Sequence, residues 1–196
     1  MPAVIMVHGW KGDETVMGIF KQTVPPGVAV VSPRGPLAVE DGGYSWFLRT
    51  GTELQPTPPE SLLESLSQLR QFITELPQLY PIDPTRLVLI GFSQGSTMAN
   101  SLIFTYPQLA IGVASLAGLI PDVIQQTKSP NLAGLPVFIA HGVRDEIVPL
   151  AAARYTRDLY RQLGAEVTYG EYHTGHKLTV QGMADLKAWL AKMREL

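Results

Sequence analysis

The stretch that decides the fold spans residues 86–106 and reads RLVLIGFSQGSTMANSLIFTY. Its first part, Leu87–Ile90, is a continuous apolar run, which is typical of a strand buried on both faces of a sheet. Its last part, Ser96–Tyr106, is compatible with a helix. Between them, Gly91-Phe92-Ser93-Gln94-Gly95 matches the G-x-S-x-G pattern of a serine held in a sharp strand-to-helix turn. The stretch therefore predicts alternating strands and helices with Ser93 as candidate nucleophile, although a serine that only caps the following helix would give the same pattern.

Similar apolar runs recur along the rest of the chain. They are Val4–Val7, Val28–Ser32, Ile111–Leu116, Pro136–Ala140 and Val167–Tyr172. Amphipathic helical patterns lie between them, at Ser61–Leu76, Ala151–Leu163 and Val180–Met193, and Gly164 follows the second as a plausible C-cap. Strands that alternate with helices predict a mostly parallel six-stranded α/β sheet with helices on both faces. We expect a single domain over residues 1–196, because chains of this length seldom divide.

Composition narrows the chemistry and the partners. The 196 residues are 45% hydrophobic and include no cysteine, which excludes disulfides, thiolate metal sites and a cysteine nucleophile. Fifteen basic and 17 acidic residues give a net charge of -2 without a basic cluster, which argues against nucleic acid as a partner. No apolar run approaches the roughly 20 residues of a membrane span. Residues 1–7 lack the features of a signal peptide, so we expect a cytoplasmic protein.

A serine nucleophile needs a base, and the base needs an acid that orients it. After a strand–turn–helix serine, the acid follows next in the chain and the histidine comes last. Asp145 lies just past the predicted strand Pro136–Ala140, and the adjacent Glu146 is the alternative acid. His176 lies just past the last predicted strand and is the expected base, with His173 as the alternative.

These positions predict one site. Ser93, Asp145 and His176 each follow a different predicted strand, and the carboxyl ends of parallel strands meet at one edge of a sheet. Backbone N–H groups of Gln94 and Trp10 are the expected oxyanion-hole donors, because one follows the serine and the other follows the first strand. We expect neither a metal nor an organic cofactor. A rival metal site would use His8, Asp13 and His173, but their spacing resembles no usual ligand pair.

Residues 34–60 show neither the helical nor the strand period. Such a length is unusual for a connection, and long loops are often functional. The run Tyr44-Ser45-Trp46-Phe47 is too aromatic for a disordered linker. Two interpretations stay open, a wall of the substrate pocket and an ordered excursion that covers the sheet.

With these residues in place, the chain resembles α/β-hydrolases of the phospholipase/carboxylesterase family, a group with acyl-protein thioesterases, lysophospholipases and small bacterial carboxylesterases. The resemblance runs from Val4 to about Leu190 and rests mainly on GFSQG at 91–95, the block from His141 through Asp145 to Pro149, and Gly175-His176. It implies a catalytic triad of Ser93, Asp145 and His176. It also implies the strand order 4-3-5-6-7-8 in the numbering of that fold, without the fold's first two strands.

The resemblance also implies a reaction. We expect cleavage of carboxylic ester or thioester bonds of short to medium acyl chains through an acyl-enzyme, with a small-molecule substrate. The expected pocket residues are Trp46, Phe47, Leu119 and Ile120, with the Trp10 side chain at the mouth. Departures from the family pattern are Trp10 and Lys11 in the first loop and Leu48 after Phe47, and they leave the substrate open.

Other functions stay open at this point. They are acyl-protein thioesterase or lysophospholipase activity, acyl transfer to an acceptor other than water, and a hydrolase-fold binding protein without catalysis. A nucleotide-binding protein is disfavoured, because no glycine-rich phosphate loop follows any strand. The sequence does not determine the oligomeric state, but an exposed apolar loop around Trp46 would provide a contact surface for a homodimer.

Overall fold

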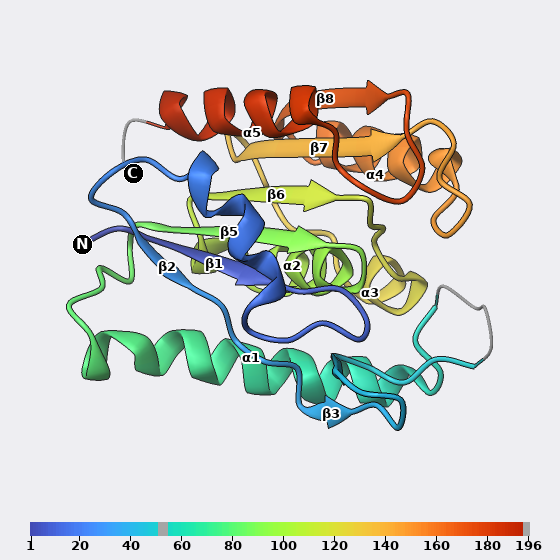
Figure 1. Cartoon of the computed structure of the whole chain (residues 1–196), viewed down its shortest axis with the longest axis horizontal. Coiled ribbons are helices and arrows are strands. Elements are labelled where there is room, and N and C mark those ends of the chain that lie inside the picture. Colours follow the sequence, from blue (N-terminus) through green and yellow to red (C-terminus); the bar gives the residue numbers. More distant parts are fainter. Residues whose placement is uncertain (51–54, 194–196) are drawn as a thin grey trace.

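The computed structural model describes residues 1–50 and 55–193 of the chain. Its centre is a six-stranded sheet in the order β2-β1-β5-β6-β7-β8, and all neighbouring strands run parallel (Figure 1). The strands are β1 (Ala3–Val7), β2 (Ala29–Val31), β5 (Leu87–Phe92), β6 (Gly112–Leu116), β7 (Pro136–Gly142) and β8 (Glu166–Tyr172). The predicted strand order is confirmed.

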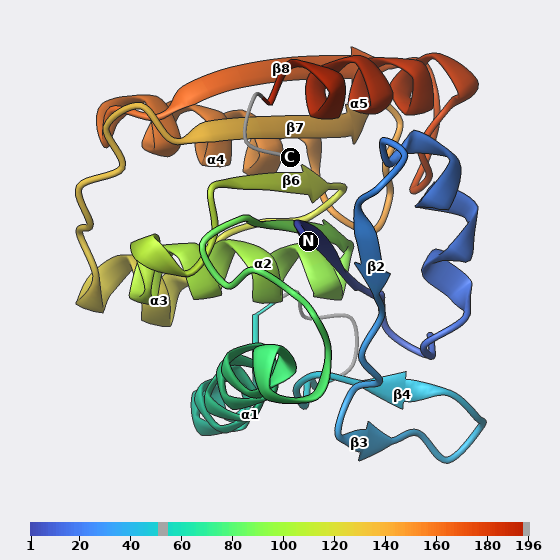
Figure 2. The ribbon, with the colours of Figure 1, turned by 90° about the vertical axis from the view of Figure 1, so that its left-hand side faces the viewer.

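Helices cover both faces of the sheet, as predicted (Figure 2). On one face lie α1 (Pro59–Leu79), α2 (Gln94–Thr105), α3 (Asp122–Thr127) and α4 (Leu150–Gln162). On the other lie the 3₁₀ helix η1 (Val16–Thr23) and α5 (Val180–Lys192). Alternate residues of a strand point to opposite faces. In β1, Ile5 therefore packs in the first core, and Val4 and Met6 pack in the second.

The helix ends follow their local sequence. Helix α1 starts after Pro58, and its buried stripe matches the predicted apolar set Leu62, Leu66, Leu69, Ile73 and Leu76. The helix extends a few residues beyond the predicted Ser61–Leu76 at both ends. At the end of α4, Gly164 adopts φ +89°, which a residue with a side chain rarely does. Its N–H donates to Arg161 O, and the N–H of Ala165 donates to Tyr160 O, so the predicted C-cap is confirmed.

Several short elements were not predicted. They are η1, α3, the 3₁₀ turn η2 (Pro107–Leu109) and an antiparallel pair formed by β3 (Leu37–Ala38) and β4 (Tyr44–Ser45). The pair β3–β4 lies within residues 34–60, so the described part of that stretch contains a small hairpin (Figure 2). Two predicted strand ends were also too early, because β5 continues to Phe92 and β7 continues to Gly142. His141 therefore lies inside β7 and not in the loop beyond it.

Candidate active site

Ser93 occupies the sharp turn between β5 and α2. Its backbone has φ 54° and ψ −118°, a conformation that costs energy for a residue with a side chain. The flanking glycines make the turn possible, because a Cβ on Gly91 would collide with the Gly95 carbonyl and a Cβ on Gly95 would collide with the Val7 carbonyl. The N–H of Ser93 donates to Leu116 O at 2.8 Å, which ties the turn to β6. The sequence pattern and the local geometry thus agree.

Hydrogen bonds join Ser93 to the predicted acid and base. The Oγ of Ser93 lies 2.8 Å from Nε2 of His176, and Nδ1 of His176 lies 2.8 Å from Oδ2 of Asp145. The Asp145 side chain is fully buried, and its Oδ1 accepts from the N–H groups of Ile147 and Val148, both at 2.9 Å. The carboxylate is therefore fixed on both oxygens and can orient the imidazole.

The alternative acid and base do not join this chain. Glu146 is exposed next to Asp145, and His173 is exposed at the end of β8. The backbone carbonyl of His173 accepts from Arg144 at 3.1 Å, while its ring projects outward.

His141 lies beneath the acid, a position that the sequence did not predict. Its Nε2 lies 2.8 Å from Val148 O and 3.5 Å from Oδ2 of Asp145. A carbonyl can only accept, so Nε2 carries the proton and the ring is oriented by Val148. Burial lowers the pKa of His141, which keeps the ring neutral. No described residue provides a partner for its buried Nδ1.

The expected oxyanion donors come from two segments. Gln94 opens α2, and N–H groups in the first turn of a helix have no intrahelical acceptor. Trp10 lies in a turn closed by the Gly12 N–H and the Gly9 carbonyl at 3.0 Å, with Lys11 at φ 61°. The turn lies against the nucleophile, because a Cβ on Gly9 would be 3.3 Å from the Ser93 Cβ.

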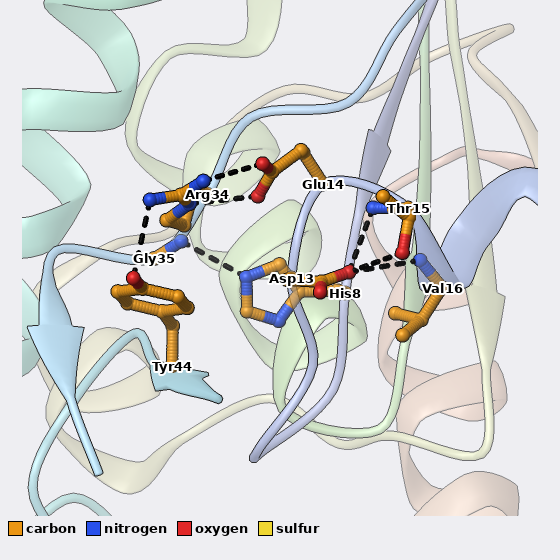
Figure 3. A network of polar contacts seen from close by, with 8 residues as sticks. All are labelled: His8, Asp13, Glu14, Thr15, Val16, Arg34, Gly35 and Tyr44. Atoms are coloured by element: carbon orange, nitrogen blue, oxygen red, sulfur yellow. Dashed lines mark hydrogen bonds and ion pairs between the residues drawn. The ribbon is translucent and has the colours of Figure 1, made fainter. Parts of the chain in front are cut away.

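His8 braces this turn against the segment that leads to β3 (Figure 3). Its Nδ1 donates to Gly9 O at 2.7 Å, and its Nε2 accepts from the Gly35 N–H at 2.9 Å. Burial lowers the pKa of His8, which favours this neutral form. Nearby, the Arg34 guanidinium pairs with the carboxylate of Glu14 and donates to the Tyr44 hydroxyl.

The rival metal site does not form from these side chains. Both ring nitrogens of His8 already have partners, and Oδ1 of Asp13 accepts from the N–H and the hydroxyl of Thr15 (Figure 3). Across residues 1–50 and 55–193, no group of three or more histidine, aspartate or glutamate side chains is placed to hold a metal ion. His8 therefore acts as a structural brace.

Comparison with known proteins identifies the group to which this architecture belongs. A family model described as Phospholipase/Carboxylesterase matches residues 1–194. The chain belongs to the phospholipase/carboxylesterase family. It is 27% identical to the "Putative hydrolase MhqD" of Bacillus subtilis, over 95% of this chain and 90% of the relative. It is 26% identical to "Acyl-protein thioesterase 1" of Debaryomyces hansenii, over 93% and 87%.

Solved structures agree with this family assignment. The Bacillus cereus carboxylesterase superposes with a TM-score of 0.88 and 29% identity, covering 97% of this chain and 88% of that one. The protein is accordingly a hydrolase of the esterase class. Of the helices in the described ranges, none has the length and apolar character that a bilayer span requires.

In this family member, a small cavity of about 40 Å³ adjoins the nucleophile. It is lined by Trp10, Phe47, Arg49, Ser93, Gln94, Thr97, Leu119, Ile147 and Val148. Two of the expected pocket residues, Phe47 and Leu119, are among these lining residues. The Arg49 guanidinium stacks 4.3 Å from the Trp10 ring centre, which places a cation at the rim. At this volume the cavity has room for roughly three water molecules.

Trp46 and Ile120 were expected in this cavity wall, and both predictions were wrong. The two side chains belong to the core between the sheet and α1–α3. Trp46 is only 2% exposed, and its indole Nε1 donates to His8 O at 2.9 Å. The suggestion of a homodimer contact around Trp46 therefore loses its basis, because this residue does not reach the surface.

The side chain of Gln94 holds the segment around Trp46 in place. Its Oε1 accepts from the Trp46 N–H at 2.9 Å, and its Nε2 donates to Phe47 O at 3.0 Å. Phe47 is thereby fixed as a wall of the cavity beside Ser93. Within the described part of residues 34–60, one portion forms the hairpin β3–β4, and another contributes Phe47 to the core and to the cavity beside Ser93.

Proposed function

We propose that this protein hydrolyses carboxylic esters and thioesters of short acyl groups through an acyl-enzyme on Ser93. The observation that carries the proposal is the continuous hydrogen-bond chain from Ser93 Oγ through His176 to Asp145, at 2.8 Å for both links. A serine becomes nucleophilic when a neighbouring base can accept its proton, and this chain provides that base together with the acid that orients it.

In the proposed reaction, Ser93 Oγ attacks the carbonyl carbon while Nε2 of His176 takes the hydroxyl proton. Asp145 stabilises the resulting imidazolium. The N–H groups of Trp10 and Gln94 stabilise the negative oxygen of the tetrahedral intermediate. The intermediate then collapses, the bond to the alcohol or thiol breaks, and His176 returns the proton to that leaving group. Water, deprotonated by His176, releases the acid and restores Ser93.

The cavity volume argues for the short end of the expected acyl range. About 40 Å³ beside Ser93 suits an acetyl or propionyl group better than a medium chain. The bulky rings of Trp10 and Phe47 limit it on two sides. A relative of this chain is named acyl-protein thioesterase, and the same atoms would attack a thioester carbonyl, so both bond types belong to the proposal.

Turnover of p-nitrophenyl acetate by the wild type and by Ser93→Ala tests the proposal. We expect the variant to lose at least about 10³-fold in kcat, because the nucleophile is removed. Ser67→Ala is a matched control, since Ser67 is an exposed serine on α1, and it should retain wild-type turnover. Parallel assays with an S-acetyl thioester compare the two bond types. Equal rates for the wild type and Ser93→Ala would overturn the proposal.

A further inference from the structure

A second, much larger hollow is lined by the Gly9–Gly12 turn. Its volume is about 520 Å³, against about 40 Å³ for the cavity beside Ser93. The turn, η1, Phe92 and the segment leading into α5 form its walls. Met17 and Phe20 are buried beneath it, while Ile19 stands 65% exposed at the rim. We call this hollow the η1 groove.

The η1 groove is contiguous with the reacting groups. Trp10 lines both hollows and thus stands between them. Phe92, another groove residue, has its ring 5.2 Å from the His176 ring. Lys177, the neighbour of His176, lines the groove as well. The η1 groove therefore begins next to His176, close enough for a substrate with its carbonyl at Ser93 to extend towards it past the Trp10 ring.

The proton transfers decide which half of the substrate faces the groove. The leaving-group oxygen or sulfur must come within hydrogen-bond reach of Nε2 of His176, since that nitrogen protonates it. Phe92 and Lys177, which flank His176, belong to the η1 groove. The acyl group needs no contact with His176. It would therefore occupy the small cavity beside Ser93, which is formed in part by Phe47 and Leu119.

Volume and lining then define the leaving group. A hollow of about 520 Å³ lies in the range of sites for small organic molecules, whereas about 40 Å³ does not. Side chains such as Met17, Phe20 and Met183 make the walls mainly apolar. We propose that the η1 groove binds the apolar alcohol or thiol part of the substrate, which is the leaving group. This inference rests on the proposed function. The preferred substrates are then small acids esterified to large apolar alcohols.

A pair of isomeric esters tests this inference. Hexyl acetate and ethyl hexanoate have the same formula and differ in which side of the ester bond carries the long chain. We expect kcat/KM for hexyl acetate to exceed that for ethyl hexanoate by at least about tenfold, because burial of several methylene groups in the groove favours it. Equal values, or a preference for ethyl hexanoate, would overturn the inference.

A variant at the edge of the η1 groove tests whether the preference for hexyl acetate arises in this groove or from the general hydrophobicity of the protein surface. Ile19→Glu places a charge at an exposed position of the groove, and we expect it to reduce the ratio of the two kcat/KM values by about tenfold. Leu63→Glu, at a 44% exposed leucine on α1, is the matched control and should leave the ratio unchanged. An unchanged ratio in Ile19→Glu would count against the groove.

The two proposals fail in different ways. If p-nitrophenyl acetate is cleaved in a Ser93-dependent manner but neither isomer is, the proposed function stands and the role of the η1 groove is wrong. If none of the three esters is cleaved, the proposed function itself fails, and the inference falls with it.

Discussion

Each oxygen of the Asp145 carboxylate has its own partners. Oδ2 accepts from His176, and Oδ1 accepts from two backbone N–H groups of the following turn. Nε2 of His141 approaches Oδ2 from below at 3.5 Å. The carboxylate cannot rotate without losing several hydrogen bonds at once. We therefore propose that Asp145 holds the His176 ring in its orientation, and a substitution of Asp145 can test this role.

Asp145→Asn should reduce kcat for p-nitrophenyl acetate by about 10³–10⁴-fold. An amide of the same shape favours the wrong tautomer of the imidazole and cannot stabilise its charged form. Glu146→Gln is the matched control, because Glu146 is the exposed neighbouring acid, and it should remain within about twofold of the wild type. A large loss in Glu146→Gln with little loss in Asp145→Asn would reverse the assignment of the acid.

Two buried histidines make stability depend on pH. Burial lowers the pKa of both His8 and His141, so the folded protein keeps them neutral while the unfolded chain takes up protons below about pH 6.5. The unfolded state then binds more protons, and the free energy of unfolding falls as the pH drops from 7 towards 5. Each histidine contributes a slope of at most about 1.4 kcal/mol per pH unit.

Urea denaturation at a series of pH values between 5 and 8 measures this slope. His141→Gln removes one of the two titrating rings, so its free energy of unfolding should vary less steeply below pH 6.5 than that of the wild type. Above pH 7.5 both proteins should show little dependence on pH from this source. A wild-type stability that stays constant from pH 7 to 5 would contradict the prediction.

At the scale of elements, periodicity predicts what is long and regular. The six apolar runs correspond to the six strands of the main sheet. The central strand β1 is buried on both faces and is wholly apolar, whereas the edge strand β8 is less buried and also contains Glu and Thr residues. The strands β3 and β4, of two residues each, and the six-residue helix α3 are too short to show the period of their own element type. Their positions depend on tertiary hydrogen bonds, for example that from the Tyr44 N–H to Gly12 O.

The same distinction applies to the candidate site. Strands are visible in the sequence and the ends of β5 and β7 were placed to within two residues, so Ser93, Asp145 and His176 could be selected by their position after three strands. The sequence does not show which wall an apolar side chain faces. Trp46 and Phe47 are neighbours of similar character and both pack in the core, yet only Phe47 also lines the cavity. The support of Asp145 by His141 was equally hidden, because it requires β7 to continue past Ala140.

The segment around Trp46 should depend on the side chain of Gln94. In Gln94→Leu, the Trp46 N–H loses its buried acceptor, whereas the Phe47 carbonyl keeps its hydrogen bond from the Ser45 hydroxyl. The change should cost roughly 1–3 kcal/mol of unfolding free energy. Hydrogen exchange at the Trp46 amide should accelerate more than exchange in β5. Gln71→Leu, which removes an exposed pair with Glu75 on α1, is the control and should change stability by less than about 0.5 kcal/mol. Unchanged exchange at Trp46 would contradict this role.

At the scale of the whole molecule, two cores share one sheet. Every strand that gives a side chain to the core under α1–α4 gives its neighbours to the core under η1 and α5, as Leu89 and Ile90 of β5 illustrate. Loss of packing in one core would destabilise the strands on which the other core also packs. We therefore propose that residues 1–196 unfold as one domain.

Tryptophan fluorescence can test this cooperativity directly. Trp46 lies in the first core and Trp189 in the second, on opposite faces of the sheet. Variants that retain only one of these two, with the other tryptophans replaced by phenylalanine, report on each face separately. In each variant, the fluorescence transition in urea should coincide with that of far-UV circular dichroism. A separate transition for either tryptophan would contradict a single unit.

The double anchoring of the hairpin β3–β4 has a practical consequence for enzyme engineering. Its base is held at one end by His8 through Gly35 and at the other by Gln94 through Trp46. Its tip at Gly42 is exposed, and an added Cβ there would meet no atom within 4 Å. The tip also lies near the η1 groove, because Asp41 pairs at 3.1 Å with Lys11, which lines that groove. A peptide inserted at Gly42 would thus be carried by the anchored hairpin β3–β4 and could cover the η1 groove, where it would influence which substrates bind. The groups around Ser93 would keep their positions.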